Sequence, residues 1–139
     1  MKKIFITIIV LFNVYSTRLQ KDILREELQD KAFMLSEILL SNGIPADWNS
    51  ENVKVIGLVT HDGHVTEKRF DEFKEISYEN AKKIFGLAGF DFYIRIIDSN
   101  ELLQEYGTEQ ETAEEIVSLH RIIFYENQAA QLEVRIWRV

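Results

Sequence analysis

The pattern of hydrophobic positions divides this chain at about residue 40. Residues 4–17 carry no charged side chain and are mostly apolar, whereas from residue 18 to residue 40 the apolar positions recur every three or four residues. That spacing is typical of a helix with one buried face. Pro and Gly are absent before Asn42-Gly43, and Pro45 follows two residues later. The pattern therefore predicts one continuous helix that ends at Asn42-Gly43.

This predicted helix is too long to be covered by a small domain. About forty helical residues span about 60 Å, so part of the helix must lie in lipid or against another chain. We expect the first part to act as a membrane and assembly helix through its large apolar residues: Ile4, Phe5, Ile8, Ile9, Phe12 and Tyr15. We expect the second part to lie beneath a globular head through a spine of four leucines: Leu24, Leu28, Leu35 and Leu39. The expected organisation is an anchor segment, 1–17, followed by an amphipathic helix and an α+β head, 18–139.

The apolar segment has three interpretations. A basic start at Lys2-Lys3 before an apolar centre is typical of a secretory signal peptide. The second interpretation is a membrane-spanning helix, although fourteen residues span only about 21 Å of a hydrocarbon core of about 30 Å. The third is a buried β-strand, because β-branched side chains are dense between Ile4 and Val10. Continuity with the amphipathic segment favours a helix, since nothing between Phe12 and Arg25 resembles a turn.

The rest of the chain alternates between strand-like and helix-like patterns. Residues 101–115 contain six glutamates and no basic residue, which indicates a solvated excursion, and residues 126–130 indicate a hairpin loop. In the last strand, alternate residues are apolar, which is the pattern of a sheet with one solvated side. The predicted helices cover 66–76 and 78–87, and the predicted strands cover 53–59, 91–98, 116–125 and 131–139. The expected fold class is α+β, with a long N-terminal helix packed on a mainly antiparallel four-stranded sheet and two short helices inserted.

Composition excludes several classes of function. The net charge is −7, and Lys2 and Lys3 are the only charges before Arg18, so the remainder of the chain carries −9. An acidic body binds phosphate poorly, and we therefore expect no nucleic acid partner. With no cysteine, the chain has neither disulfides nor thiolate metal ligands.

The candidate chemistry is weak. His61 and His64 flank Asp62-Gly63 and would suit zinc if a third ligand converged, but Asp-Gly is also a common tight-turn dipeptide. Ser118 and His120 share a strand face without the turn that exposes a catalytic serine. We therefore expect a protein that is not an enzyme, with no catalytic, cofactor-binding or metal residues and no cofactor.

Several stretches resemble archaeal type IV pilin-like proteins, the family whose precursors carry a class III signal peptide. They are Lys31–Leu40 running into Gly43–Trp48, Val53–Leu58, Leu87–Tyr93 and Leu132–Trp137. In such families the apolar helix sits in the membrane and later packs into a filament core. The resemblance implies a membrane-anchored, surface-exposed pilin-like or pseudopilin subunit, with its head on the extracytoplasmic side of the cell membrane. Its partners would be the membrane and other copies or pilus-type subunits, reached through the N-terminal helix.

Two features depart from the family pattern. Pilin precursors are cut after a basic leader that ends in a small residue, but no glycine follows Lys2-Lys3, and no acid precedes Asp22. Either the native chain starts upstream of Met1 or the protein does not enter filaments, and our hypothesis is the upstream start. The competing hypothesis is a membrane-tethered sensory or small-ligand-binding domain, in which the acidic segment 101–115 or an aromatic group lines a cleft. That aromatic group is Phe90, Phe92 and Tyr93.

Overall fold

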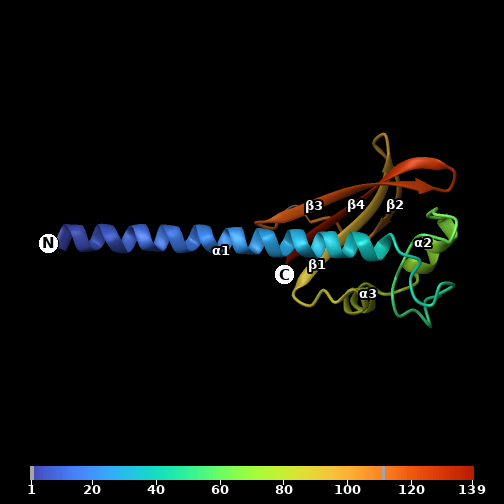
Figure 1. The fold of residues 1–139 in the computed structure, drawn as a ribbon, viewed down its shortest axis with the longest axis horizontal. Coiled ribbons are helices and arrows are strands. Elements are labelled where there is room, and N and C mark those ends of the chain that lie inside the picture. The colour runs from blue at the N-terminus through green and yellow to red at the C-terminus, as the bar shows by residue number, and fades with distance from the viewer. Residues whose placement is uncertain (1, 111) are drawn as a thin grey trace.

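The computed structural model describes the backbone of residues 2–110 and 112–139, and the side chains of residues 20–110 and 112–139. The chain has an α+β fold in which one long helix lies against a four-stranded antiparallel sheet and two short helices pack beside it (Figure 1). The helices are α1 (Lys2–Leu39), α2 (Glu67–Lys74) and α3 (Tyr78–Phe85). The strands are β1 (Phe90–Asp98), β2 (Glu101–Tyr106), β3 (Ile116–Tyr125) and β4 (Gln128–Arg138). The expected α+β class is confirmed.

Two hairpins that meet along their inner strands make the sheet. The strand order is β2-β1-β4-β3, and every neighbouring pair is antiparallel. The β1–β2 hairpin closes through Ser99 and Asn100, whose φ angles of 48° and 76° suit a two-residue type I′ turn. Because β2 and β3 lie on opposite edges, the connection between them has to pass β1 and β4. We call its described residues, 107–110 and 112–115, the crossing segment.

The inner face of the sheet packs against α1. Alternate residues of the two central strands are buried on this face: Phe92, Ile94 and Ile96 of β1, and Leu132, Val134 and Ile136 of β4. Leu28, Leu35 and Leu39 of α1 are fully buried in the same core, and Leu24 packs against it from a partly buried position. The apolar alternation predicted for these strands is confirmed on this face.

On its N-terminal side, α1 leaves the head before Leu24. Residues 20–23 are exposed, and the side chain of Ile23 is 56% exposed. Close to this point Glu27 of α1 pairs with Arg138 of β4 at 3.2 Å. Figure 1 shows the helix continuing beyond the sheet. Among the residues of α1 whose side chains are described, those that pack in the head begin at Leu24.

Both short helices are where the sequence predicts them. The side chains of Thr66 and Ser77 accept hydrogen bonds from backbone N–H groups in the first turns of α2 and α3. Gly86 ends α3 with a φ of 70°, in the left-handed region that favours glycine. The two helices add aromatic residues to the core: Phe70, Phe73 and Phe85.

Residues 53–59 form no strand, so the predicted first strand is wrong. The segment bonds to the end of α1 and to the turn after it, and not to the sheet: the Leu58 N–H donates to the Leu39 carbonyl (2.8 Å), the Val59 N–H donates to the Ser41 carbonyl (3.2 Å), and Val55 exchanges hydrogen bonds with Ile44. The Leu39 carbonyl is one of those that a helix end leaves without an intrahelical partner, and Leu58 supplies its donor. Gly57 permits the close approach, because a Cβ there would lie 2.2 Å from the Ser41 oxygen.

The predicted solvated excursion is also wrong over its first six residues, which form β2. Gln104 and Tyr106 point to the core, where Gln104 donates to the Tyr125 hydroxyl (2.8 Å) and the Tyr106 hydroxyl donates to the Ile76 carbonyl (2.6 Å). The acidic composition concealed this alternation. The last hairpin is tighter than predicted as well, because β3 and β4 already pair at Tyr125 and Gln128.

Candidate functional site

The outer face of the sheet, opposite α1, carries a row of charged residues that crosses all four strands. The register places Glu105 beside Arg95, Arg95 beside Glu133, and Glu133 beside His120. Their signs alternate where histidine is protonated, so each neighbouring pair can attract. We call these four residues the charge ladder.

Glu133 is the centre of the charge ladder and is almost completely buried, with 1% of its surface exposed. Its carboxylate accepts from Arg95 at 2.9 Å, from Arg135, and lies 3.6 Å from His120 Nε2. Burial alone raises the pKa of Glu133, but the hydrogen bonds and charges of Arg95 and Arg135 outweigh burial and hold the pKa below its ordinary value. Glu133 is therefore an ionised, fully paired acid, which suits a structural role better than proton transfer.

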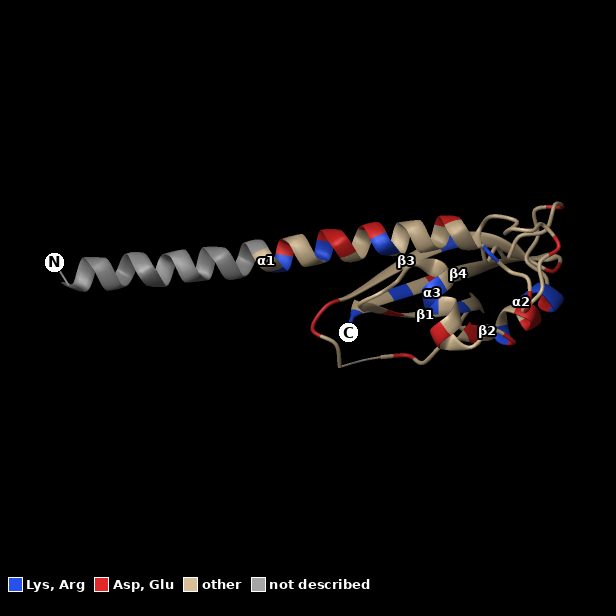
Figure 2. Cartoon of the chain, turned by 90° about the horizontal axis from the view of Figure 1, so that it is seen from below, with Lys and Arg blue, Asp and Glu red and all other residues tan. Residues whose placement is uncertain are grey.

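The expectation of one solvated sheet side fails beside the charge ladder. Tyr93 and Trp137 belong to the outer face, yet they are only 3% and 6% exposed. The crossing segment explains this burial, since Glu109 reaches from it to Arg135 on β4. Figure 2 shows acidic residues on this segment where it passes the end of the sheet. A segment expected to be free in solvent instead covers one end of the outer face.

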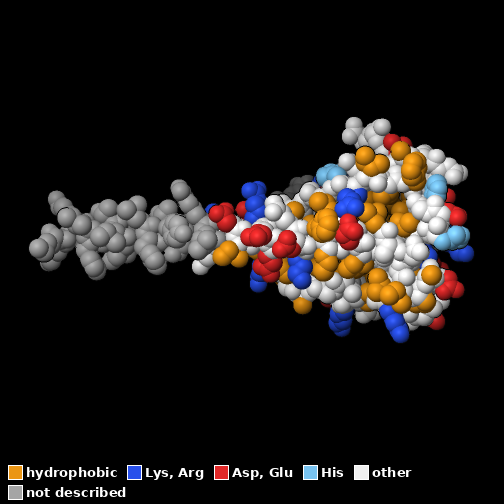
Figure 3. All heavy atoms as spheres, in the orientation of Figure 1, with side chains coloured by type: hydrophobic (Ala, Val, Ile, Leu, Met, Phe, Trp, Pro, Cys, Tyr) orange, Lys and Arg blue, Asp and Glu red, His pale blue; other side chains and the backbone are white. Residues whose placement is uncertain are grey.

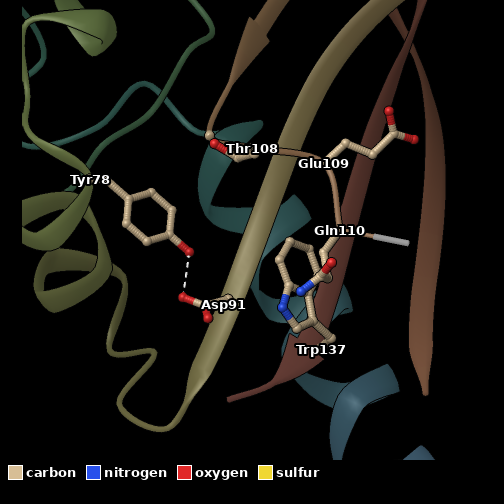
Figure 4. A pocket seen from close by; sticks show the side chains of 7 residues that line it. Tyr78, Asp91, Thr108, Glu109, Gln110 and Trp137 are labelled. Carbon is tan, nitrogen blue, oxygen red and sulfur yellow. Dashed lines mark hydrogen bonds between the residues drawn. The ribbon is translucent and has the colours of Figure 1, made fainter. Parts of the chain in front are cut away.

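A cavity of about 320 Å³ opens between the crossing segment, α3 and this end of the sheet. The strand register sets Asp91 of β1 directly beside Trp137 of β4. Figure 4 shows Asp91 between Tyr78 and Trp137, with the crossing segment passing above them. The lining residues are Tyr78, Asp91, Gly107, Thr108, Glu109, Gln110 and Trp137. We call this hollow the Trp137 cavity.

Tyr78 is fixed at the wall of the Trp137 cavity by two hydrogen bonds. Its hydroxyl donates to Asp91 Oδ1 (2.7 Å) and accepts from the Phe92 N–H (3.0 Å). The pairing of β2 with β1 ends at Ile94, so the Tyr78 oxygen takes the place of a strand partner for Phe92. Burial and the hydrogen bond to Asp91 raise the pKa of Tyr78, which therefore remains a neutral phenol at physiological pH.

Each acid at the Trp137 cavity has a basic partner. Lys82 of α3 lies 3.2 Å from Asp91 Oδ1, and Arg135 pairs with Glu109. Gly107 brings the crossing segment close to β1. Its φ is 91°, and a Cβ at this position would lie only 3.0 Å from the Phe92 carbonyl oxygen. The cavity thus combines aromatic walls with polar groups whose charges are compensated.

The predicted membrane and assembly residues, from Ile4 to Tyr15, lie outside the residues whose side chains are described. Over residues 20–110 and 112–139, no helix is long and apolar enough to cross a bilayer. The spine residues Leu28, Leu35 and Leu39 lie in the core of the head. Their role in assembly stays a prediction.

The histidines do not converge. His61 lies 3.3 Å from exposed Asp62, His64 Nδ1 lies 2.7 Å from the Glu126 carbonyl oxygen, and His120 faces Glu133. Within the described part of the chain, no group of three His, Asp or Glu side chains is placed to hold a metal ion.

Sequence reasoning missed most of the Trp137 cavity. The acidic segment does line it, through Glu109, but Phe90, Phe92 and Tyr93 do not. Asp91 and Trp137 lie far apart in sequence and meet only through the β1–β4 register. The available signal was that both residues occupy outward positions near the sheet end where β1 begins and β4 ends.

Comparisons of this chain with protein-family models, with curated proteins and with solved structures find no match.

Proposed function

We propose that the protein is a non-enzymatic, membrane-anchored and surface-exposed pilin-like or pseudopilin subunit that acts through helix packing and head contacts. The observation that carries the proposal is the departure of α1 from the head before Leu24, on the side of the apolar segment 4–17. The resemblance to archaeal type IV pilin-like proteins supports the same function, and so does a long helix packed on an antiparallel sheet.

The length of α1 supports an anchor. Its 38 residues correspond to about 57 Å of helix, and the head takes up only the part after residue 23. A helix that is uncharged from residue 4 to residue 17 is stabilised when lipid or other copies of the chain remove it from water.

The charges next to this segment support a boundary between the anchor and the head. Lys21, Asp22, Arg25 and Glu26 are all exposed, and charged side chains gather where α1 leaves the head (Figure 3). Such residues remain in water or among lipid headgroups. In the orientation that the pilin-like resemblance implies, Lys2-Lys3 would face the cytoplasm and the acidic head would lie on the extracytoplasmic side.

Exposed apolar residues on α1 offer contacts for neighbouring copies. Ile23 and Phe33 are 56% and 55% exposed although they lie on a helix that is otherwise polar on its outward side. In a bundle of parallel helices, these side chains would pack against the α1 of an adjacent subunit. The expected partners are therefore the membrane and other subunits of the same type.

A charge-insertion experiment tests the anchor. Lysine at the centre of a spanning helix costs about 2.5–3.5 kcal/mol, so the double variant Ile8→Lys/Phe12→Lys should move the full-length chain from the membrane pellet to the soluble fraction. Ile122→Lys, at an 85% exposed position on the sheet, is the control and should stay with the membrane. Wild-type protein that is soluble and monomeric would refute the proposal. Electron microscopy of the cell surface then distinguishes a filament subunit from a solitary one.

The second candidate function is a membrane-tethered ligand-binding domain. The observation that favours it is the Trp137 cavity, which brings Tyr78, Asp91 and Trp137 together from α3, β1 and β4. This function shares the anchor with the first and differs only in what the head does.

A further inference from the structure

We propose that the Trp137 cavity binds a neutral pyranose sugar, free or at the end of a glycan. The inference rests on the second candidate function, that of a ligand-binding head, and it names the class of ligand. It is independent of whether the chain assembles into a filament.

The charge balance of the cavity indicates a neutral ligand. Asp91 is paired with Lys82 at 3.2 Å, and Glu109 with Arg135. A cationic ligand would have to displace one of these bases, and an anion would meet two carboxylates. A neutral ligand leaves both ion pairs in place.

The polar groups of the cavity suit hydroxyl groups. Both side-chain hydrogen bonds to Asp91 end on Oδ1, which leaves the lone pairs of Oδ2 for a ligand hydroxyl. Thr108 adds a hydroxyl and Trp137 an indole N–H donor at the same cavity. A sugar presents several hydroxyls that both donate and accept, so it can use acceptors and donors placed side by side.

The apolar surface of the cavity suits the other side of a sugar ring. Tyr78 lines the cavity with aromatic carbon next to these polar groups, and the 6% of Trp137 that is exposed adds to it (Figure 4). Pyranose rings have faces of C–H groups that pack on aromatic side chains, while their hydroxyls point outward. A volume of about 320 Å³ is at the small end of the usual range of about 300–1,000 Å³ for ligand sites, which suits a single ring.

The cavity is also held in shape before any ligand arrives. Tyr78 makes two hydrogen bonds, and Asp91 and Trp137 are held by the β1–β4 pairing. Preorganised groups lose little conformational freedom on binding. The weak affinity expected for one sugar ring can therefore still be selective.

The test uses the full-length chain in detergent micelles and follows the indole N–H resonances of its two tryptophans by NMR. The Trp137 signal is assigned by its loss in Trp137→Phe. The probes for NMR are neutral methyl pyranosides, a quaternary ammonium ion and acetate. Binding to immobilised neutral glycans is measured separately, by retention of the protein. We expect saturable shifts of the Trp137 signal, with a dissociation constant in the millimolar range, for at least one pyranoside. Binding to the immobilised glycan alone would place the site at the end of a chain of sugars.

Variants complete the test. Asp91→Ala should weaken sugar binding at least tenfold, and Asp91→Asn provides a second reading if the alanine variant is unfolded. Asp98→Ala, at the other end of β1, is the matched control and should bind as the wild type does. Shifts with the ammonium ion or acetate but with no sugar would overturn the ligand class and leave a ligand-binding head. No response to any probe would overturn both the ligand class and the second candidate function.

Discussion

The two faces of one sheet differ in how far they are buried and in what buries them. The inner face is covered by α1 over β3 and β4 and by aromatic residues of α2 and α3 over β1 and β2. It is almost entirely aliphatic and aromatic, and Leu35 of α1 is fully buried in this core. The outer face is covered at one end by the crossing segment and holds Glu133 at 1% exposure through Arg95 and Arg135. The comparison shows that an apolar face needs only a neighbour of suitable shape, whereas a buried acid needs specific partners.

The largest expected effect comes from the inner face. Leu35→Ala removes a fully buried side chain between α1 and the sheet and should lower the free energy of unfolding by about 2–5 kcal/mol. Urea denaturation followed by circular dichroism measures this loss. Ile122→Ala on the outer face, where the side chain is 85% exposed, is the control and should change stability by no more than about 0.5 kcal/mol. Equal losses would mean that α1 does not cover the sheet.

A smaller effect is expected from the centre of the outer face. Glu133→Gln keeps the shape of the side chain but removes the charge that Arg95 and Arg135 share, and should cost about 1–3 kcal/mol. Glu105→Gln, in the same row but exposed, loses its charge beside Arg95 and keeps an oxygen that can accept from the Tyr93 hydroxyl, so it should cost less than about 1 kcal/mol. If the two variants are equally stable, Glu133 is not the centre of the charge ladder.

The third prediction compares the stability of the wild type with that of Glu133→Gln as a function of pH. The pKa of Glu133 is lower in the folded state than its ordinary value of 4.5, so its contribution to stability is complete above that pH and is lost as the pH falls through the folded-state value. The difference in unfolding free energy between wild type and Glu133→Gln should therefore be constant near neutral pH and shrink below about pH 4.5. A difference that grew on acidification would contradict the ionised state assigned to Glu133.

The inner face could be predicted from sequence and the outer face could not. Helix periodicity and the alternation in β1 and β4 are local signals, and the helix caps at Thr66 and Ser77 are local too. They were sufficient to place the short helices and the residues of α1 that face the core.

The failures share a non-local cause. Residues 53–59 have a strand pattern, but their hydrogen-bond partners are the end of α1 at Leu39 and the turn that follows it, which a pattern cannot indicate. Residues 101–115 were predicted to be solvated because they are acidic, although Gln104 and Tyr106 occupy alternate, inward positions of β2. The Trp137 cavity depends on the register between β1 and β4, and so on residues that are distant in the chain. Only the tertiary pairing reveals that Asp91 has Trp137 as its neighbour.

The strand order has a consequence for how the head is made. β4 follows the other three strands in the chain but lies between β1 and β3. During synthesis β1, β2 and β3 emerge before β4. Neither β1 nor β3 can complete its pairing until residues 128–138 have left the ribosome. The head should thus fold only after translation of this segment, because the central pairings of the sheet are among the last contacts that the chain can form.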